Sequence, residues 1–179
     1  ISPEDKAKID EIFKDVDGIA KTNSVTIVNN ETQTSFSATS GDDKVIINTQ
    51  AGQTVYGGNG DDIIVSGKGN DKLQGGTGFN SYIFFKGAGK DTVIYDNTGV
   101  GFDKLAFVDI KSSDAIYYQK GNDLVIRYGS DEVTLTGALG TNSSKHILLN
   151  FSDKTVFLTQ ILMQPFQNIK LEDNTVING

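Results

Sequence analysis

The chain has 179 residues, enough for one or two domains with a real apolar core. Its formal net charge of -7 excludes the basic surface that nucleic-acid binding needs, and its lack of cysteine excludes disulfides and thiolate-bound zinc. We find no apolar run long enough to span a membrane and no signal-peptide core, so we predict no transmembrane segment and no Sec-dependent export. Because the chain starts at Ile1, we expect it to be a piece of a longer protein.

The first predicted element is an N-terminal helix. Ser2 and Pro3 suit its start, and Asp5 places a carboxylate in its first turn. Its apolar side chains then recur on one face, and Gly18 ends it; they are Ile9, Ile12, Phe13 and Val16. Such a helix could bind a membrane surface or a partner, but we favour a cap on the open end of the following domain. Two strands, 25–28 and 35–38, complete an N-terminal region over 1–37.

A nine-residue repeat follows, clearest in the segment 57–78, GGNGDDIIVSGKGNDKLQGGTG. Its pattern is G-G-x-G-x-D-x-U-x, in which U is a large apolar residue. Six residues would form a turn and three a short strand whose eighth position, occupied by Ile64, Leu73 and Tyr82, faces inward. Two repeats would complete one coil. The period predicts an all-β fold, a parallel β-roll over residues 38–106.

The turns have the chemistry of a calcium site. Glycines let the backbone adopt positive φ and approach an ion closely, and the sixth position supplies a side-chain oxygen of the kind calcium prefers. The candidate glycines are Gly58, Gly60, Gly67, Gly69, Gly76, Gly78 and Gly89. The sixth positions should sort onto two edges of the roll, one with Asp43, Asp62, Asn80 and Asp103, the other with Gln53, Asp71 and Asp91.

The pairs with two carboxylates are the best candidate sites. These are Asp43 with Asp62 and Asp71 with Asp91, so we expect about two to four calcium ions. In the Asp61-Asp62 doublet, Asp62 would be the ligand and Asp61 a solvent-facing residue.

Longer alternating strands follow the repeats and predict a β-rich cap over 107–179. The expected strands are 116–119, 124–128 and 132–136, followed by a hairpin about 152–154 and a short helix over 159–163. The cap would cover the last edge of the roll, which would otherwise pair with other chains. The tail from Gln167 is compatible with the start of a secretion signal.

These repeats and the closing segments that follow them resemble RTX (repeats-in-toxin) hemolysin-type proteins over about residues 38–163. The resemblance implies a secreted, extracellular protein of a Gram-negative bacterium that uses a type I secretion apparatus through an uncleaved C-terminal signal. It also implies folding on external calcium and a host-cell surface as a partner. The chain departs from the pattern at Gln53 and Asn80, and in the sequence GALG after Thr136.

We find no catalytic constellation and predict that this chain is not an enzyme. His146 is the only histidine, and Ser143 and Ser144 lack a nucleophile elbow. We predict a calcium-binding RTX module that folds after type I secretion, in the C-terminal part of a cytolysin-like toxin. The alternatives are the secretion and folding module of an exported hydrolase or epimerase, and the ligand-binding end of a surface adhesin. Exposed Tyr117 or Tyr118 could bind carbohydrate in the last case.

Overall fold

The fold is almost entirely β structure. The structure, a computed structural model, describes residues 24–95, 102–140, 146–163 and 169–171. The predicted N-terminal helix and most of the C-terminal tail lie outside these residues. The strands of the repeat region are β1 (Ser24–Val28), β2 (Ser35–Ser37), β3 (Asp43–Ile47), β4 (Thr54–Asn59), β5 (Ile63–Val65), β6 (Lys72–Thr77), β7 (Ser81–Phe84), β8 (Lys90–Val93) and β9 (Asp103–Phe107).

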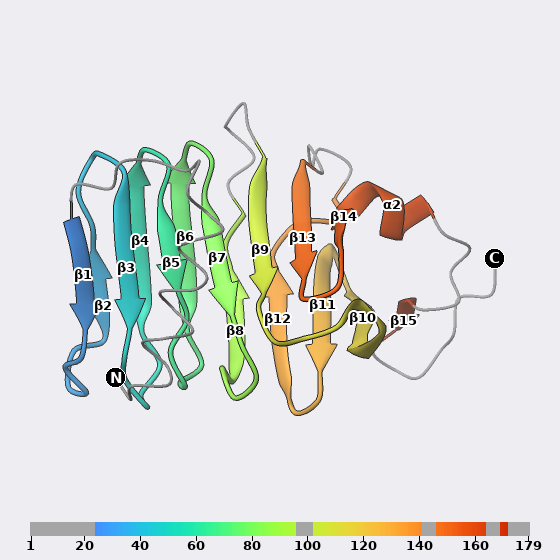
Figure 1. The fold of residues 1–179 in the computed structure, drawn as a ribbon, viewed down its shortest axis with the longest axis horizontal. Helices are drawn as coiled ribbons and strands as arrows, with labels where there is room; N and C mark the ends of the chain where they lie inside the picture. The colour runs from blue at the N-terminus through green and yellow to red at the C-terminus, as the bar shows by residue number, and fades with distance from the viewer. Residues whose placement is uncertain (1–23, 96–101, 141–145, 164–168, 172–179) are drawn as a thin grey trace.

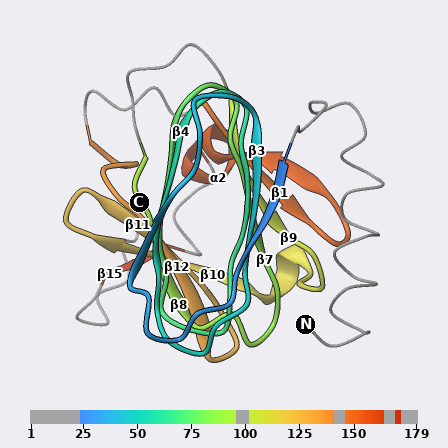
Figure 2. The same ribbon diagram turned by 90° about the vertical axis from the view of Figure 1, so that its left-hand side faces the viewer.

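Successive strands of this region alternate between two facing sheets (Figures 1 and 2). Sheet A has the order β1-β3-β5-β7-β9 and sheet B contains β2-β4-β6-β8, with parallel pairing throughout. In sheet A, Val45 is in register with Ile64, Ile64 with Tyr82, and Tyr82 with Leu105. The chain is therefore a parallel β-roll, as the nine-residue period predicts, and its pairing already begins at β1 and β2.

The core lies between the two sheets. Ile64, Leu73 and Tyr82 are at most 1% exposed, which confirms that the eighth position of each repeat points inward. Because side chains alternate along a strand, the apolar inner residues of both sheets meet and exclude water from the middle of each coil. This burial holds the strands that carry the turns.

The C-terminal part extends both sheets. Its elements are η1 (Ser112–Asp114), β10 (Ala115–Lys120), β11 (Asp123–Tyr128), β12 (Asp131–Leu135), β13 (Ile147–Phe151), β14 (Thr155–Phe157), α2 (Leu158–Met163) and β15 (Ile169–Leu171). β12 pairs in parallel with β8 and begins an antiparallel meander with β11 and β10, while β13 pairs in parallel with β9 and forms a hairpin with β14. The predicted strands, hairpin and short helix are all confirmed.

Aromatic rings join the roll to this C-terminal part. Phe107 of β9 stacks on Phe84 and Phe151, with ring centroids 5.7 and 5.0 Å apart, and meets Tyr128 edge-on at 5.4 Å. Strand pairing and core packing continue across residue 107. The division of the chain into three regions at residues 38 and 107 stays a prediction. Of the helices in the described ranges, none is long and apolar enough to cross a membrane.

Candidate metal-binding turns

The sixth positions of the repeats form two ladders at the turns, one on each edge of the roll. On the first edge, the Asp43 amide donates to Asp62 Oδ1 (2.9 Å) and the Asp62 amide donates to Asn80 Oδ1 (3.1 Å). The Asn80 amide then donates to Asp103 Oδ1 (2.9 Å). All four residues are at most 7% exposed, so the predicted edge exists as a buried stack.

The second edge repeats this geometry. The Gln53 amide donates to Asp71 Oδ1 and the Asp71 amide donates to Asp91 Oδ1, both at 2.8 Å. The three residues are at most 2% exposed. The sequence therefore predicted correctly which sixth positions lie next to each other, although the coil between Asp71 and Asp91 is longer than two repeats.

Asp62 carries a buried oxygen without a hydrogen-bond partner. Its Oδ1 accepts the Asp43 amide, but its Oδ2 meets no donor. A Cβ atom built on Gly57 would collide with this oxygen and lie 2.6 Å from the carbonyl oxygen of Gly75, so both oxygens border the space that glycine leaves open. Burial, with a smaller contribution from neighbouring carboxylates, raises the pKa of Asp62 to about 6. A carboxylate and a carbonyl oxygen beside one small space fit a hard cation.

Asp71 and Asp91 converge on a single hydroxyl group. Ser66 Oγ lies 3.2 Å from Asp71 Oδ2 and 2.7 Å from Asp91 Oδ2. Because a hydroxyl has one proton, it can satisfy only one of these oxygens at a time. Burial raises the pKa of Asp71, and it raises the pKa of Asp91 to about 7. The pair therefore favours binding a proton or a metal cation.

The side chain of Gln53, on the second edge, also has buried polar atoms without hydrogen-bond partners. Both polar atoms of its buried amide lack a hydrogen-bond partner. Such groups ordinarily meet an ordered water or an ion. The amide offers an oxygen where an intact repeat has aspartate, without the charge.

The glycines in the second position make the close stacking of the turns possible. Gly58 and Gly76 have φ values of 113° and 90°, which side-chain-bearing residues rarely adopt. A Cβ on Gly76 would collide with the carbonyl oxygen of Gly58 in the preceding coil. Gly58 and Gly76 lie near the ends of β4 and β6. The remaining predicted glycines lie between strands, where an added Cβ would meet backbone or side-chain atoms; these are Gly60, Gly67, Gly69, Gly78 and Gly89.

On the first edge, another series of hydrogen bonds runs beside the ladder of sixth positions. It corrects the prediction that Asp61 is a solvent-facing residue. The Asp61 amide donates to Asp42 Oδ1, and Asp61 Oδ1 accepts the Phe79 amide, both at 2.8 Å. Asp61 is therefore half-buried and organises the turn instead of simply facing solvent. Neither Asp61 nor Ser66 follows from the nonapeptide pattern, because both contacts depend on how successive coils stack.

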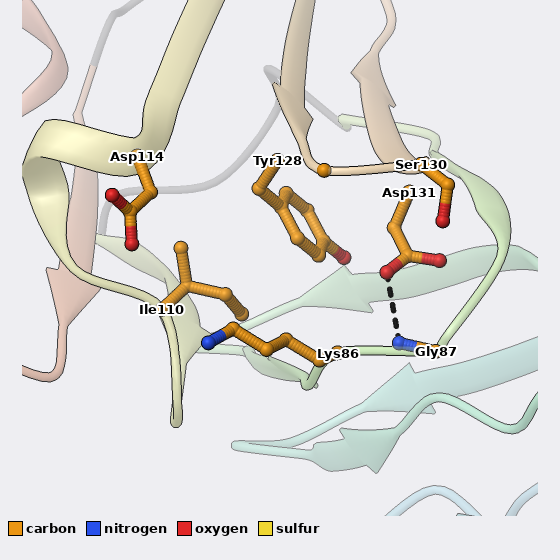
Figure 3. A pocket seen from close by; sticks show the side chains of 8 residues that line it. Lys86, Gly87, Ile110, Asp114, Tyr128, Ser130 and Asp131 are labelled. Carbon is orange, nitrogen blue, oxygen red and sulfur yellow. Dashed lines mark hydrogen bonds between the residues drawn. The ribbon is translucent and has the colours of Figure 1, made fainter.

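Asp131 binds the last turn of the second edge (Figure 3). The sequence did not predict this contact. Asp131 is the first residue of β12. Its two carboxylate oxygens accept hydrogen bonds from the backbone amides of Gly87 (2.8 Å) and Gly89 (3.1 Å). A half-open cavity of about 370 Å³ adjoins it, and the buried Tyr128 hydroxyl on its wall has no hydrogen-bond partner. No repeat pattern marks Asp131, since it comes from the meander more than forty residues downstream.

Of the residues considered for catalysis, the structure describes only His146. His146 is exposed beside Phe102, with ring centroids 5.1 Å apart, and Ser143 and Ser144 lie outside the described residues. Of the two tyrosines considered for carbohydrate binding, Tyr117 packs in the core at 5% exposure and Tyr118 is partly buried. Within the described ranges, no group of three or more His, Cys, Asp or Glu side chains is placed to hold a metal. A cation at these turns would therefore need backbone carbonyl oxygens beside the paired carboxylates.

Comparison with known families agrees with this geometry. Residues 49–82 match the RTX calcium-binding nonapeptide repeat (4 copies). No curated protein matches the chain. The matched segment contains the turns of Asp62, Asp71 and Asn80, and repeats of this family bind calcium ions. The chain therefore contains RTX calcium-binding nonapeptide repeats at residues 49–82, within a parallel β-roll.

Proposed function

We propose that this chain is a folding module whose calcium ions bind at the two turn edges, in the C-terminal part of a toxin secreted by a type I apparatus. Two observations carry the proposal: the buried Asp62 Oδ2 meets no hydrogen-bond donor among the described residues, and the buried Asp71 and Asp91 share the single Ser66 hydroxyl. Burying a carboxylate is costly unless it is protonated or compensated by positive charge.

The first site would use the Asp62 carboxylate and the Gly75 carbonyl oxygen. The second would use Asp71 and Asp91, with Ser66 Oγ as an additional oxygen. These two positions account for the lower end of the expected range of about two to four ions. Asp43, Asn80 and Asp103 continue the first edge and would supply any further sites.

Calcium would act on folding through its preference for the folded state. Without the ion, folding must bury charged or protonated carboxylates, and the short strands of each coil bury little apolar area to offset chain entropy. A ligand that binds only the folded state stabilises it by mass action. At extracellular calcium concentrations, on the order of 1 mM, weak sites of this kind would fill. The resemblance to type I secreted proteins supports export in the unfolded state.

The folding part is tested by circular dichroism and calcium titration. We expect chelator-treated protein to be largely disordered between residues 38 and 105 and to gain β structure with millimolar calcium. Equal magnesium should have little effect, because magnesium requires a rigid octahedral shell. Identical spectra with chelator and with calcium would refute calcium-coupled folding.

Secretion and toxicity need separate measurements. Co-expression with a type I exporter should place the chain in the medium, and retention in the cells with or without the exporter would contradict the secretion proposal. The parent protein should permeabilise membranes in a calcium-dependent manner. Hydrolase activity or glycan binding without permeabilisation would favour the exported enzyme or the adhesin.

A further inference from the structure

Two neighbouring sixth positions on the first edge, Asp62 and Asn80, differ in the partner of their second side-chain atom. In both residues Oδ1 accepts the backbone amide of the sixth position one coil earlier. The second atom of Asp62, Oδ2, is buried and has no hydrogen-bond partner. The second atom of Asn80, Nδ2, donates to the Gly76 carbonyl oxygen at 3.1 Å. Both side chains are at most 1% exposed, so the difference lies in their hydrogen bonds and not in their burial.

The two turns are equivalent in the roll. β4 pairs in register with β6, which places Gly58 beside Gly76, and each of these glycines lies four residues before the sixth position of its turn. The Gly58 carbonyl oxygen is therefore the counterpart of the oxygen that Asn80 Nδ2 contacts. An aspartate at the sixth position brings an acceptor towards this carbonyl group, whereas an asparagine brings a donor. A hard cation can join two oxygen acceptors, so the Asp62 turn needs such an ion and the Asn80 turn does not.

The space beside the two turns differs in the same way. A Cβ atom built on Gly57 would meet the unpartnered Asp62 Oδ2 and the carbonyl oxygen of Gly75. At Gly75, the equivalent position one coil later, the three nearest atoms to an added Cβ all belong to the Asn80 side chain, and Nδ2 is one of them. Two oxygens therefore border the first space, and a nitrogen donor takes the place of the carboxylate oxygen in the second.

The turn on the other side of Asp62 also contains its own donors. Asp43 Oδ2 accepts the Thr39 backbone amide (2.8 Å) and the Thr39 hydroxyl (2.6 Å). Thr39 lies four residues before Asp43, as Gly76 lies four residues before Asn80. In both neighbours of the Asp62 turn, the chain itself thus supplies a hydrogen-bond partner for the second side-chain atom.

We propose that the Asn80 side-chain amide is an internal substitute for a calcium ion and holds its turn together without metal. Asn80 would then not be a ligand, although it lies in the segment 49–82 that matches the calcium-binding repeat. The neutral amide also separates the carboxylates of Asp62 and Asp103 in the ladder, which lowers their mutual repulsion. The inference rests on the proposed function and narrows it, because it removes Asn80 from the residues that could supply a further site.

Asn80→Asp tests the inference by restoring the carboxylate of an intact repeat. In a calorimetric calcium titration, we expect this variant to bind about one more ion per chain than the original protein, because two acceptors would then face each other as in the Asp62 turn. Asn59→Asp is the matched control. It makes the same chemical change at an exposed position of a neighbouring turn and should leave the number of bound ions unchanged.

Hydrogen exchange of side-chain amides, measured by NMR, tests the contact in the original protein and does not depend on the folding of a variant. In calcium-loaded protein, the Asn80 NH2 group should exchange about tenfold or more slowly than the Gln53 NH2 group. Both side chains are 1% exposed, but Gln53 Nε2 has no hydrogen-bond partner, so the comparison isolates the bond from Asn80 to Gly76.

The outcomes distinguish this inference from the proposed function. If the original protein binds calcium but Asn80→Asp binds no additional ion, the inference alone is overturned. An additional ion in Asn59→Asp as well would overturn it too, because any added carboxylate would then recruit metal. Equal exchange of the Asn80 and Gln53 amides would show that the internal bond is absent. A protein that binds no calcium at all would refute the proposed function and this inference with it.

Discussion

Asp71 is the residue whose charge matters most on the second edge. It accepts the Gln53 and Gly67 amides, and its second oxygen also shares Ser66 with Asp91. Asp71→Asn keeps the size but removes the charge, and its side-chain NH2 group would face a backbone amide donor, that of Gln53 or that of Gly67. We expect the calcium concentration at the folding midpoint to rise by about tenfold or more, since few charged ligands remain. A calcium titration followed by circular dichroism measures the shift.

Asp61→Asn is the matched control for that substitution. Asp61 accepts the Phe79 amide but does not belong to the ladder of sixth positions. The loss of its charge should therefore change the calcium concentration at the folding midpoint little. Equal midpoint shifts in the two variants would mean that the metal-binding ladder has been assigned one residue out of register.

Protons and calcium should compete for the same buried carboxylates. The pKa values of Asp62 and Asp91 are raised from 3.8 to about 6 and about 7. Between about pH 4 and 7 the folded state therefore binds more protons than the unfolded state, and raising the pH favours unfolding. We expect metal-free protein, largely disordered at neutral pH, to gain β structure as the pH is lowered through this window, as measured by circular dichroism.

Saturating calcium should remove this pH dependence above about pH 6, because it replaces the protons. Asp91→Asn should flatten the metal-free profile near neutral pH. A metal-free profile that instead rises from pH 4 to 7 would show that the buried carboxylates are stabilised as anions by the protein alone.

At the scale of elements, Asp131 connects the meander to the last turn of the roll. Asp131→Ala would leave the Gly87 and Gly89 amides without their acceptor, at a cost of about 1–3 kcal/mol. We expect faster hydrogen exchange in residues 86–91 and a lower melting temperature. Asp123→Ala, which removes one exposed bond to the Gly137 amide, is the control and should have a smaller effect. If the two variants behave alike, Asp131 has no special role in closing the roll.

The strands and turns also show which contacts could be predicted from the sequence. The nonapeptide period predicted the sixth-position ladders and the inward Ile64, because both follow from a two-repeat coil. It did not predict Ser66 or Asp131, whose roles come from contacts between coils or from a distant strand. The sequence left open whether Tyr117 or Tyr118 is exposed, because alternation along β10 does not show which face is buried until its partner strand is known.

For the whole molecule, the C-terminal part is expected to be necessary for calcium-driven folding. β12 and β13 cover the edges of β8 and β9, and Phe107 packs against Tyr128 and Phe151. A chain ending at Ala106 keeps every proposed ligand but exposes both edges. We expect it to aggregate or to fold only at higher calcium concentration, as measured by light scattering and circular dichroism. Folding at the same calcium concentration as the full chain would make the C-terminal part an independent domain.

Parallel pairing of each strand with the strand one coil away keeps the sequence separation between partners small and nearly constant. In the intact repeats Ile64 meets Tyr82, and Val55 meets Leu73, at the same spacing. Adding coils would lengthen the molecule without lengthening the loops that folding must close, so the ordering entropy is paid coil by coil. In a chain that leaves a channel with its carboxyl end first, β12 and β13 would emerge before the repeats. They would then offer two finished edges on which each later coil could assemble, and growth of the ordered part would oppose return of the chain into the channel.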